Sequence, residues 1–96
     1  MNDELAVVTG ASRGIGQAIA LELGTRGATV IGTATSDTGA GAITAALAES
    51  GVRGTGMVLD VTDADSISAF FKAVQDEYGS PTVLVNNAGI TRDNLM

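Results

Sequence analysis

Glycine is concentrated in one short stretch of the sequence, TGASRGIG, which runs from Thr9 to Gly16 and also contains Gly10 and Gly14. An apolar, β-branched run precedes it, and a run with helix-like spacing of apolar residues follows it. A backbone without Cβ atoms can turn sharply and lets a ligand approach closely. The start of a helix presents unpaired N–H groups and a partial positive charge, which attract phosphate. The spacing therefore predicts a loop that binds the diphosphate of a dinucleotide.

Two other interpretations of this loop are weaker. The glycines could serve only to make a tight turn from strand to helix, but one glycine would suffice for that. A P-loop would need a Gly-Lys-Ser or Gly-Lys-Thr sequence at this place, and the loop contains no lysine.

The composition limits the chemistry available in the rest of the chain. Its 96 residues include no histidine, no cysteine and a single lysine, Lys72. Imidazole-based catalysis, disulfides and metal sites built from thiolates or imidazoles are therefore excluded within this chain. The formal net charge is −6 and no basic stripe occurs, so nucleic acid and anionic membranes are poor partners.

The same composition bears on location. No apolar run approaches the roughly 18 residues needed to cross a bilayer. The first ten residues lack the basic and long apolar regions of a signal peptide. Together with the lack of cysteine, which fits a reducing compartment, these features lead us to expect a cytoplasmic protein.

The elements that must position the loop alternate along the chain. Apolar runs bounded by glycines or turn residues predict strands over residues 5–9, 28–33, 56–61 and 82–85. Apolar residues at helical spacing predict helices over residues 15–26, around 43–47 and over 63–78. Strands that are apolar on both faces belong in a parallel sheet covered by helices on both sides. With right-handed crossovers, this order predicts an α/β fold: a doubly wound, Rossmann-type parallel sheet whose first four strands have the order 3-2-1-4, with three crossover helices.

The pattern also predicts how the helices pack. In the first helix, Ile15, Ile19 and Leu23 recur every four residues and should face the core. A capping box of Thr62 and Asp65 should start the third helix. The apolar face of that helix should comprise Ile67, Phe70, Phe71, Val74 and Tyr78. The first two helices should cover one face of the sheet and the third helix the other, which leaves the fourth strand as a hydrophobic edge.

Two motifs give the chain a family resemblance. The loop TGASRGIG has the pattern T-G-x-x-x-G-x-G, and Asn86-Asn87-Ala88-Gly89, after the fourth predicted strand, has the pattern N-N-A-G. In this order and context they resemble the two hallmarks of the short-chain dehydrogenase/reductase family. The stretches VIGTATS, residues 30–36, and NNAGITRDNLM, residues 86–96, are similar to the branch of that family that reduces 3-oxoacyl groups on acyl carrier protein in bacterial type II fatty acid synthesis.

The resemblance implies an NADPH-dependent oxidoreductase that acts on a 3-oxoacyl chain bound to acyl carrier protein and assembles as a homo-oligomer, specifically a homotetramer. Two alternatives remain open: a related short-chain reductase of acetoacetyl-CoA or another carbonyl, and a dinucleotide-binding half-module without catalysis. Docking of an acidic carrier protein needs basic patches, and this acidic segment shows none.

The end of the second predicted strand bears on the choice of cofactor. NAD-binding sheets place an acid there to accept hydrogen bonds from the ribose 2′-OH, whereas a 2′-phosphate prefers an arginine. Here the strand ends in Thr33-Ala34-Thr35-Ser36, and no acid occurs until Asp37. Arg13, inside the glycine loop, could hold a 2′-phosphate through charge-assisted hydrogen bonds, or be an ordinary solvated charge. The pattern favours NADPH/NADP, and Asp37 is the residue that argues against it.

By position, the resemblance implies which residues bind the cofactor. The Arg13 side chain and its loop neighbours would line the pyrophosphate and ribose, and Thr35 would lie near the 2′-phosphate. The loop set is Gly10, Ala11, Ser12, Arg13, Gly14, Ile15 and Gly16.

The ends of the third and fourth strands would complete this set. Asp60 and Val61 would flank the adenine, and the Asp60 carboxylate would accept from its exocyclic amine or, equally, cap the strand end. Asn86 is expected to hold the geometry of the fourth strand through backbone hydrogen bonds. Along the adenosine ribose and the nicotinamide would lie Asn87, Ala88, Gly89 and Ile90.

The catalytic residues of the family have no counterpart in this chain. The family protonates its substrate with the tyrosine of a Tyr-x-x-x-Lys pair, aided by a serine and an asparagine, all of which follow the matched segment. Here Tyr78 is followed four residues on by Thr82, and Lys72 precedes it, so core packing is the expected role of Tyr78. We expect residues 1–96 to be the N-terminal, dinucleotide-binding portion of a single Rossmann domain without its catalytic portion. Alone, it should be inactive and marginally stable, oligomeric or aggregation-prone.

Overall fold

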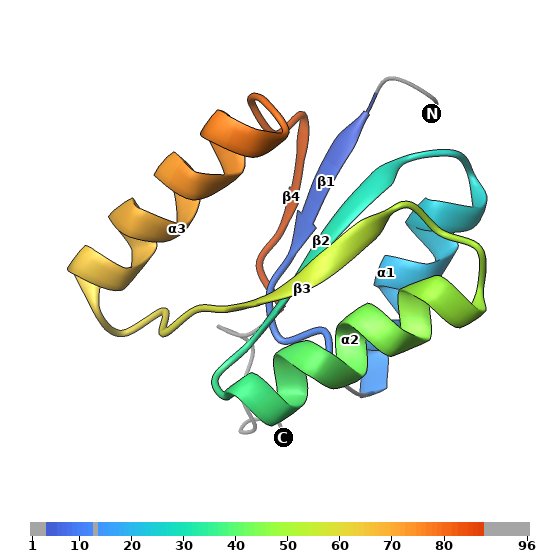
Figure 1. Cartoon of the computed structure of the whole chain (residues 1–96), viewed down its shortest axis with the longest axis horizontal. Coiled ribbons are helices and arrows are strands. Elements are labelled where there is room, and N and C mark those ends of the chain that lie inside the picture. The colour runs from blue at the N-terminus through green and yellow to red at the C-terminus, as the bar shows by residue number, and fades with distance from the viewer. Residues whose placement is uncertain (1–3, 13, 88–96) are drawn as a thin grey trace.

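The computed structural model of the chain describes residues 4–12 and 14–87. In this part of the chain, four strands form one parallel sheet in the order β3-β2-β1-β4 (Figure 1). The α/β fold class, the strand order 3-2-1-4 and the three crossover helices predicted from the sequence are confirmed. The strands are β1 (Leu5–Val8), β2 (Thr29–Ala34), β3 (Gly54–Val58) and β4 (Val83–Val85). The helices are α1 (Gly14–Thr25), α2 (Asp37–Glu49) and α3 (Ala64–Glu77).

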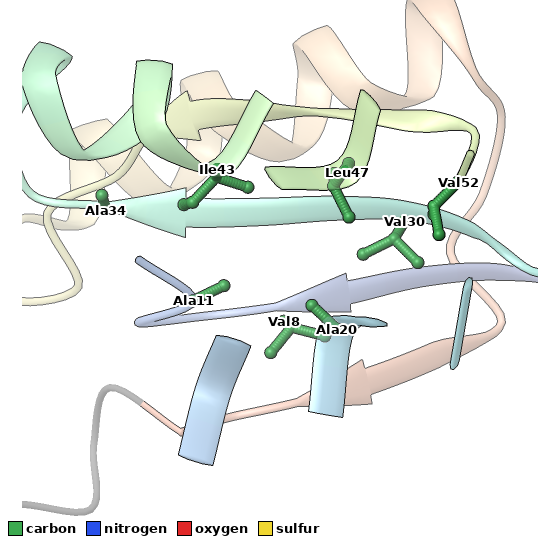
Figure 2. Packing of buried hydrophobic residues seen from close by; sticks show 8 residues of the cluster. All are labelled: Val8, Ala11, Ala20, Val30, Ala34, Ile43, Leu47 and Val52. Carbon is green, nitrogen blue, oxygen red and sulfur yellow. The ribbon is translucent and has the colours of Figure 1, made fainter. Parts of the chain in front are cut away.

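The two faces of the sheet carry separate buried clusters. Helices α1 and α2 cover one face, and α3 covers the other (Figure 1), as the sequence predicted. Figure 2 shows the cluster under α1 and α2, in which Val8 of β1 and Val30 of β2 lie among Ala20 of α1 and Ile43 and Leu47 of α2. The cluster under α3 consists of Leu5, Val7, Ile31, Leu59, Phe70 and Val74.

Helix α1 approaches the sheet through small residues. Its buried positions are Gly16 and Ala20, and a Cβ added at Gly24 would collide with the side chain of Val52. The predicted core-facing stripe is therefore wrong at its first position, because Ile15 is 72% exposed. Ile19 is partly buried against the core. The buried face of α1 differs from the predicted one because a helix that packs closely on a sheet needs its smallest residues where the two touch.

Helix α3 begins and ends differently from the sequence prediction. Its N-cap is Asp63, whose carboxylate accepts the N–H of Asp65 at 3.0 Å. The predicted capping box with Thr62 is wrong, because the Thr62 hydroxyl donates to Asp60 Oδ1 instead. Tyr78 is also not a core residue: it is the C-cap, with φ −123°, and is 41% exposed. The helical spacing stops at Glu77, so the side chain of Tyr78 no longer follows the buried stripe.

Strand β3 is shorter at its carboxyl end than the predicted range 56–61. The Leu59 N–H still donates to the Ala34 carbonyl, but Asp60 then accepts both the N–H and the hydroxyl of Thr62 through Oδ1. This local turn ends the extended run. Among the described helices, none is long and apolar enough to cross a membrane.

Candidate cofactor-binding site

The glycine loop lies at the carboxyl edge of the parallel sheet, between β1 and α1. Gly10 has φ 64° and Gly14 has φ 65°, a left-handed conformation that glycine adopts without the penalty that a Cβ brings. These two turns carry the chain from the buried end of β1 to the start of α1. The carboxyl edge of such sheets is where ligands bind in open α/β folds.

The three glycines of the motif do different things. A Cβ added at Gly14 would meet no described atom within 4 Å, so none of the described residues fills the space beside the first turn of α1 there. A Cβ at Gly16 would collide with the Gly10 carbonyl and lie 2.6 Å from Asn87 Nδ2. Gly14 therefore leaves room for a ligand at the helix N-terminus, whereas Gly16 allows α1 to pack against its own loop.

Strand β4 supports the loop from one side. The Thr9 N–H donates to the Val85 carbonyl at 3.0 Å, and the Thr9 hydroxyl donates to Asn86 Oδ1 at 3.3 Å. Asn87 Nδ2 donates to the Gly10 carbonyl at 3.1 Å. Asn86 thus links β4 to β1 through its side chain, whereas backbone hydrogen bonds were expected for this role.

Strand β2 supports the loop from the other side. The Ala11 N–H donates to the Thr33 carbonyl at 2.9 Å, and the Gly10 N–H donates to Thr33 Oγ1 at 3.4 Å. The side chains of Ala11 and Ser12 also lie near α2: an added Cβ at Gly39 would be 3.6 Å from Ser12 Cβ. The loop is therefore held between two strands and leaves its far end, at Gly14 and Ile15, exposed.

The end of β2 presents hydroxyls before the first acid. Thr35 is exposed. Ser36 is the N-cap of α2, and its Oγ accepts the Gly39 N–H at 3.1 Å. Asp37 occupies the first turn of α2, where a carboxylate interacts favourably with the helix dipole. Asp37 thus has a structural role at the helix start that needs no ribose.

The end of β3 contributes Asp60 and Val61. Asp60 Oδ1 accepts the N–H of Thr62 at 2.9 Å and its hydroxyl at 2.6 Å, and these hydrogen bonds, the hydroxyl first, lower the pKa of the Asp60 carboxyl below its ordinary value. Val61 is half-buried and packs against the cluster under α3. The contacts of Asp60 show the local capping arrangement, and its contact with adenine stays a prediction.

A hollow of about 190 Å³ opens beside this edge, on the face that α3 covers. The ends of β1 and β4, the residues after β3 and the first half of α3 surround it. Its lining is Thr9, Leu59, Val61, Ile67, Phe71, Leu84 and Asn86.

Several predicted residues lie elsewhere or outside the described part. Arg13, Ala88, Gly89 and Ile90 lie outside the described residues, so their predicted roles stay predictions. Lys72 is exposed on α3, and Tyr78, the C-cap residue that follows this helix, is also exposed. Because Tyr78 follows α3 and precedes β4, it lies at the amino edge of the sheet, opposite the glycine loop.

The hydrogen bonds by which Thr33 and Asn87 hold Gly10 were not predicted from the sequence. Thr33 is one of the buried polar residues, at 1% exposure, and the other buried residues of its strand, Val30 to Gly32 and Ala34, are apolar. A hydroxyl at such a position is the signal that could have revealed the role of Thr33, because a buried polar group needs a hydrogen-bond partner.

Comparison with known proteins identifies the family. The model of the short chain dehydrogenase family matches residues 4–96. The chain belongs to the short-chain dehydrogenase family. This assignment agrees with the glycine loop after β1 and the Asn86-Asn87 pair after β4, which the structure brings into contact.

Curated relatives match along nearly the whole chain. A protein named 3-oxoacyl-acyl-carrier-protein reductase FabG from Pseudomonas aeruginosa is 57% identical over 96 residues, 100% of this chain and 39% of the relative. A protein of the same name from Vibrio harveyi is 58% identical over 96 residues, 100% of this chain and 38% of the relative. The Escherichia coli K12 protein of that name is 56% identical over 93 residues, which are 97% of this chain and 37% of the relative. The chain thus spans about two fifths of the length of these relatives.

Proposed function

We propose that this chain is the dinucleotide-binding portion of an NADPH-dependent oxidoreductase that reduces 3-oxoacyl-acyl-carrier-protein to 3-hydroxyacyl-acyl-carrier-protein. The observation that carries the proposal is the identity of 56–58% to relatives with that name over 97–100% of the chain. The geometry supports the cofactor part of it: two left-handed glycines lead into a helix N-terminus that no other described residue covers at Gly14.

The reaction divides between two parts of such an enzyme. NADPH supplies a hydride to the keto carbon, and an acid must protonate the oxygen. The described residues support binding of the diphosphate at the exposed start of α1. Tyr78 lies at the amino edge of the sheet, away from the glycine loop, and is therefore not proposed as this acid. The acid is assigned to the segment that follows residues 1–96 in other members of the family.

The preference for NADPH is proposed from the end of β2 and from the loop. Thr35 is exposed at the strand end, and Asp37 lies in the first turn of α2. Arg13 would pair with the 2′-phosphate. We further propose a homotetrameric assembly with acyl carrier protein as the substrate's carrier, and a cytoplasmic location, which the lack of cysteine supports.

The test uses the protein expressed from its complete reading frame. NADPH oxidation is followed with acetoacetyl-acyl-carrier-protein, with acetoacetyl-CoA and with NADH in place of NADPH. We expect the carrier-bound substrate with NADPH to give the highest kcat/KM. Binding of NADPH without oxidation by either thioester would contradict the proposed activity while leaving the cofactor site intact.

The cofactor preference has its own variant. Arg13→Ala should weaken NADPH binding far more than NADH binding, since only NADPH carries the 2′-phosphate. Arg26→Ala is the matched control: it follows the other end of α1, in an exposed ion pair with Glu22 at 2.8 Å that contributes little. Equal losses of NADPH and NADH affinity in Arg13→Ala would refute the assignment.

A further inference from the structure

Thr33 is a buried hydroxyl in the middle of the sheet. It is 1% exposed and lies near the carboxyl end of β2. Side chains alternate along a strand, so Thr33 shares a face with Ile31, which belongs to the cluster under α3. A hydroxyl buried among apolar groups is costly unless it forms hydrogen bonds. The hydrogen bonds of Thr33 therefore indicate its role.

The hydroxyl and the carbonyl of Thr33 both accept hydrogen bonds from the glycine loop. Thr33 Oγ1 accepts the Gly10 N–H at 3.4 Å, and the Thr33 carbonyl accepts the Ala11 N–H at 2.9 Å. On the opposite side, Asn87 Nδ2 donates to the Gly10 carbonyl at 3.1 Å. Both backbone polar groups of Gly10 are thus engaged by the protein, at a residue with φ 64°.

This arrangement separates the loop into two parts. The Gly10 and Ala11 amides point into the protein, so the donors to a diphosphate must come from the later amides and the start of α1. The position of those donors depends on how firmly the first two peptides are held. A loop that is already fixed before binding loses less conformational freedom when the ligand arrives.

We propose that Thr33 is a positioning residue for the cofactor: it fixes the Gly10–Ala11 peptides so that the exposed end of the loop meets the diphosphate in a preorganised geometry. This inference rests on the proposed function, because it concerns a dinucleotide bound at this loop. Thr33 itself does not touch the cofactor.

The experiment measures the Kd for NADPH by calorimetry in the protein from the complete reading frame. Thr33→Val keeps the β-branched shape but removes the acceptor of the Gly10 N–H, and should weaken NADPH about twofold to fivefold, the range for one long neutral hydrogen bond. Thr33→Ser restores a hydroxyl and should bring the Kd back to within about twofold of wild type. Thr29→Val is the matched control, with the same change at the amino end of the same strand, roughly 13 Å away.

The outcomes are distinct. A weaker Kd in Thr33→Val, rescued by Thr33→Ser and absent in Thr29→Val, supports the inference. A lower denaturation midpoint with an unchanged Kd overturns it, because a merely structural role moves stability alone. If wild type does not bind NADPH, the proposed function fails and this inference fails with it.

A second measurement needs no variant. Amide hydrogen exchange in the cofactor-free wild type should show Gly10 and Ala11 already protected relative to the same amides in an unstructured peptide. Protection that arises only after NADPH is added would overturn preorganisation by Thr33, even if Thr33→Val did not fold.

Discussion

The two edges of the sheet are completed in different ways. At β3, Thr44 of α2 reaches the edge: its hydroxyl accepts the Gly56 N–H at 2.9 Å and donates to the Ala40 carbonyl at 3.1 Å. At β4, Leu84 is 58% exposed, and no described strand pairs with the outer side. Free N–H and C=O groups on a strand edge can pair with another chain. Within residues 14–87, one edge is thus hydrogen-bonded by the chain's own helix, whereas the outer side of β4 has no partner strand.

The difference extends to the packing around each edge. The β3 side relies on close approach, since added Cβ atoms at Gly54 and Gly56 would collide with the Val30 and Ala40 carbonyls. The β4 side carries a large exposed apolar side chain and the hollow beside α3. The β3 side should therefore be sensitive to added atoms. Substitutions on the β4 side should change self-association more than they change the free energy of unfolding.

The largest effect is expected from Gly54→Ala at the start of β3. The new Cβ would collide with the Val30 carbonyl, and φ is 149° there, so both overpacking and backbone strain oppose it. The free energy of unfolding should fall by about 3 kcal/mol or more, measured by urea denaturation. Gly41→Ala in α2 is the control: its Cβ meets no described atom within 4 Å, and it should gain about 0.5–1 kcal/mol. Equal free energies of unfolding for the two variants would contradict the expected sensitivity of the β3 side to added atoms.

A smaller effect is expected from Thr44→Val, which removes the hydroxyl that closes the β3 edge. The Gly56 N–H loses its acceptor, and the free energy of unfolding should fall by about 1 kcal/mol. Thr44→Ser should retain most of the stability. If Thr44→Val proves as stable as wild type in the same denaturation experiment, the hydroxyl does not close this edge.

On the open edge, Leu84→Lys should change stability by only about 0.5 kcal/mol but reduce self-association of the 96-residue chain. A lysine on an edge strand opposes pairing with another chain. Sedimentation velocity at several concentrations measures the change. Val58→Lys is the matched control, an apolar residue 44% exposed at the end of β3. A similar drop in self-association for both variants would mean that the edges do not differ.

The smallest effect concerns Asp60, just after β3. Hydrogen bonds from Thr62 lower its folded pKa below the ordinary value of 3.8. A group with a depressed folded pKa stabilises the fold fully above its unfolded pKa, and this contribution is lost as the pH falls through the folded pKa. The stability difference between wild type and Asp60→Asn should be constant at neutral pH and shrink only as the pH falls toward and below the ordinary value of 3.8. A difference that already changes between about pH 5 and 7, well above the ordinary carboxyl pKa, would contradict this cause.

The sequence was sufficient for the topology because strands and helices alternate along the chain and each strand includes apolar residues close to turn residues. Predictions from the sequence were wrong or incomplete where packing depends on the size of the contacting side chains, or on residues that are far apart in the sequence. Ile15 has the helical spacing of a core residue, but α1 packs through Gly16 and Ala20 instead. Asn87 and Gly10 are 77 residues apart, and only the pairing of β4 with β1 brings them together.

Local competition explains the other errors. Thr62 and Asp63 are adjacent candidates for the cap of α3, and Asp63 takes it because Asp60 engages the Thr62 hydroxyl. The glycine motif predicted the position of the loop between β1 and α1, which the structure confirms. It did not distinguish Gly14, beside which none of the described residues fills the space, from Gly16, which packs against the Gly10 carbonyl.

The most direct test is a crystal structure, with NADP bound, of the protein expressed from its complete reading frame. We expect diphosphate oxygens about 3 Å from backbone nitrogens between Ser12 and Ile15, with the Gly10 amide still directed to Thr33. A diphosphate bound elsewhere, or side chains filling the space beside Gly14, would contradict it.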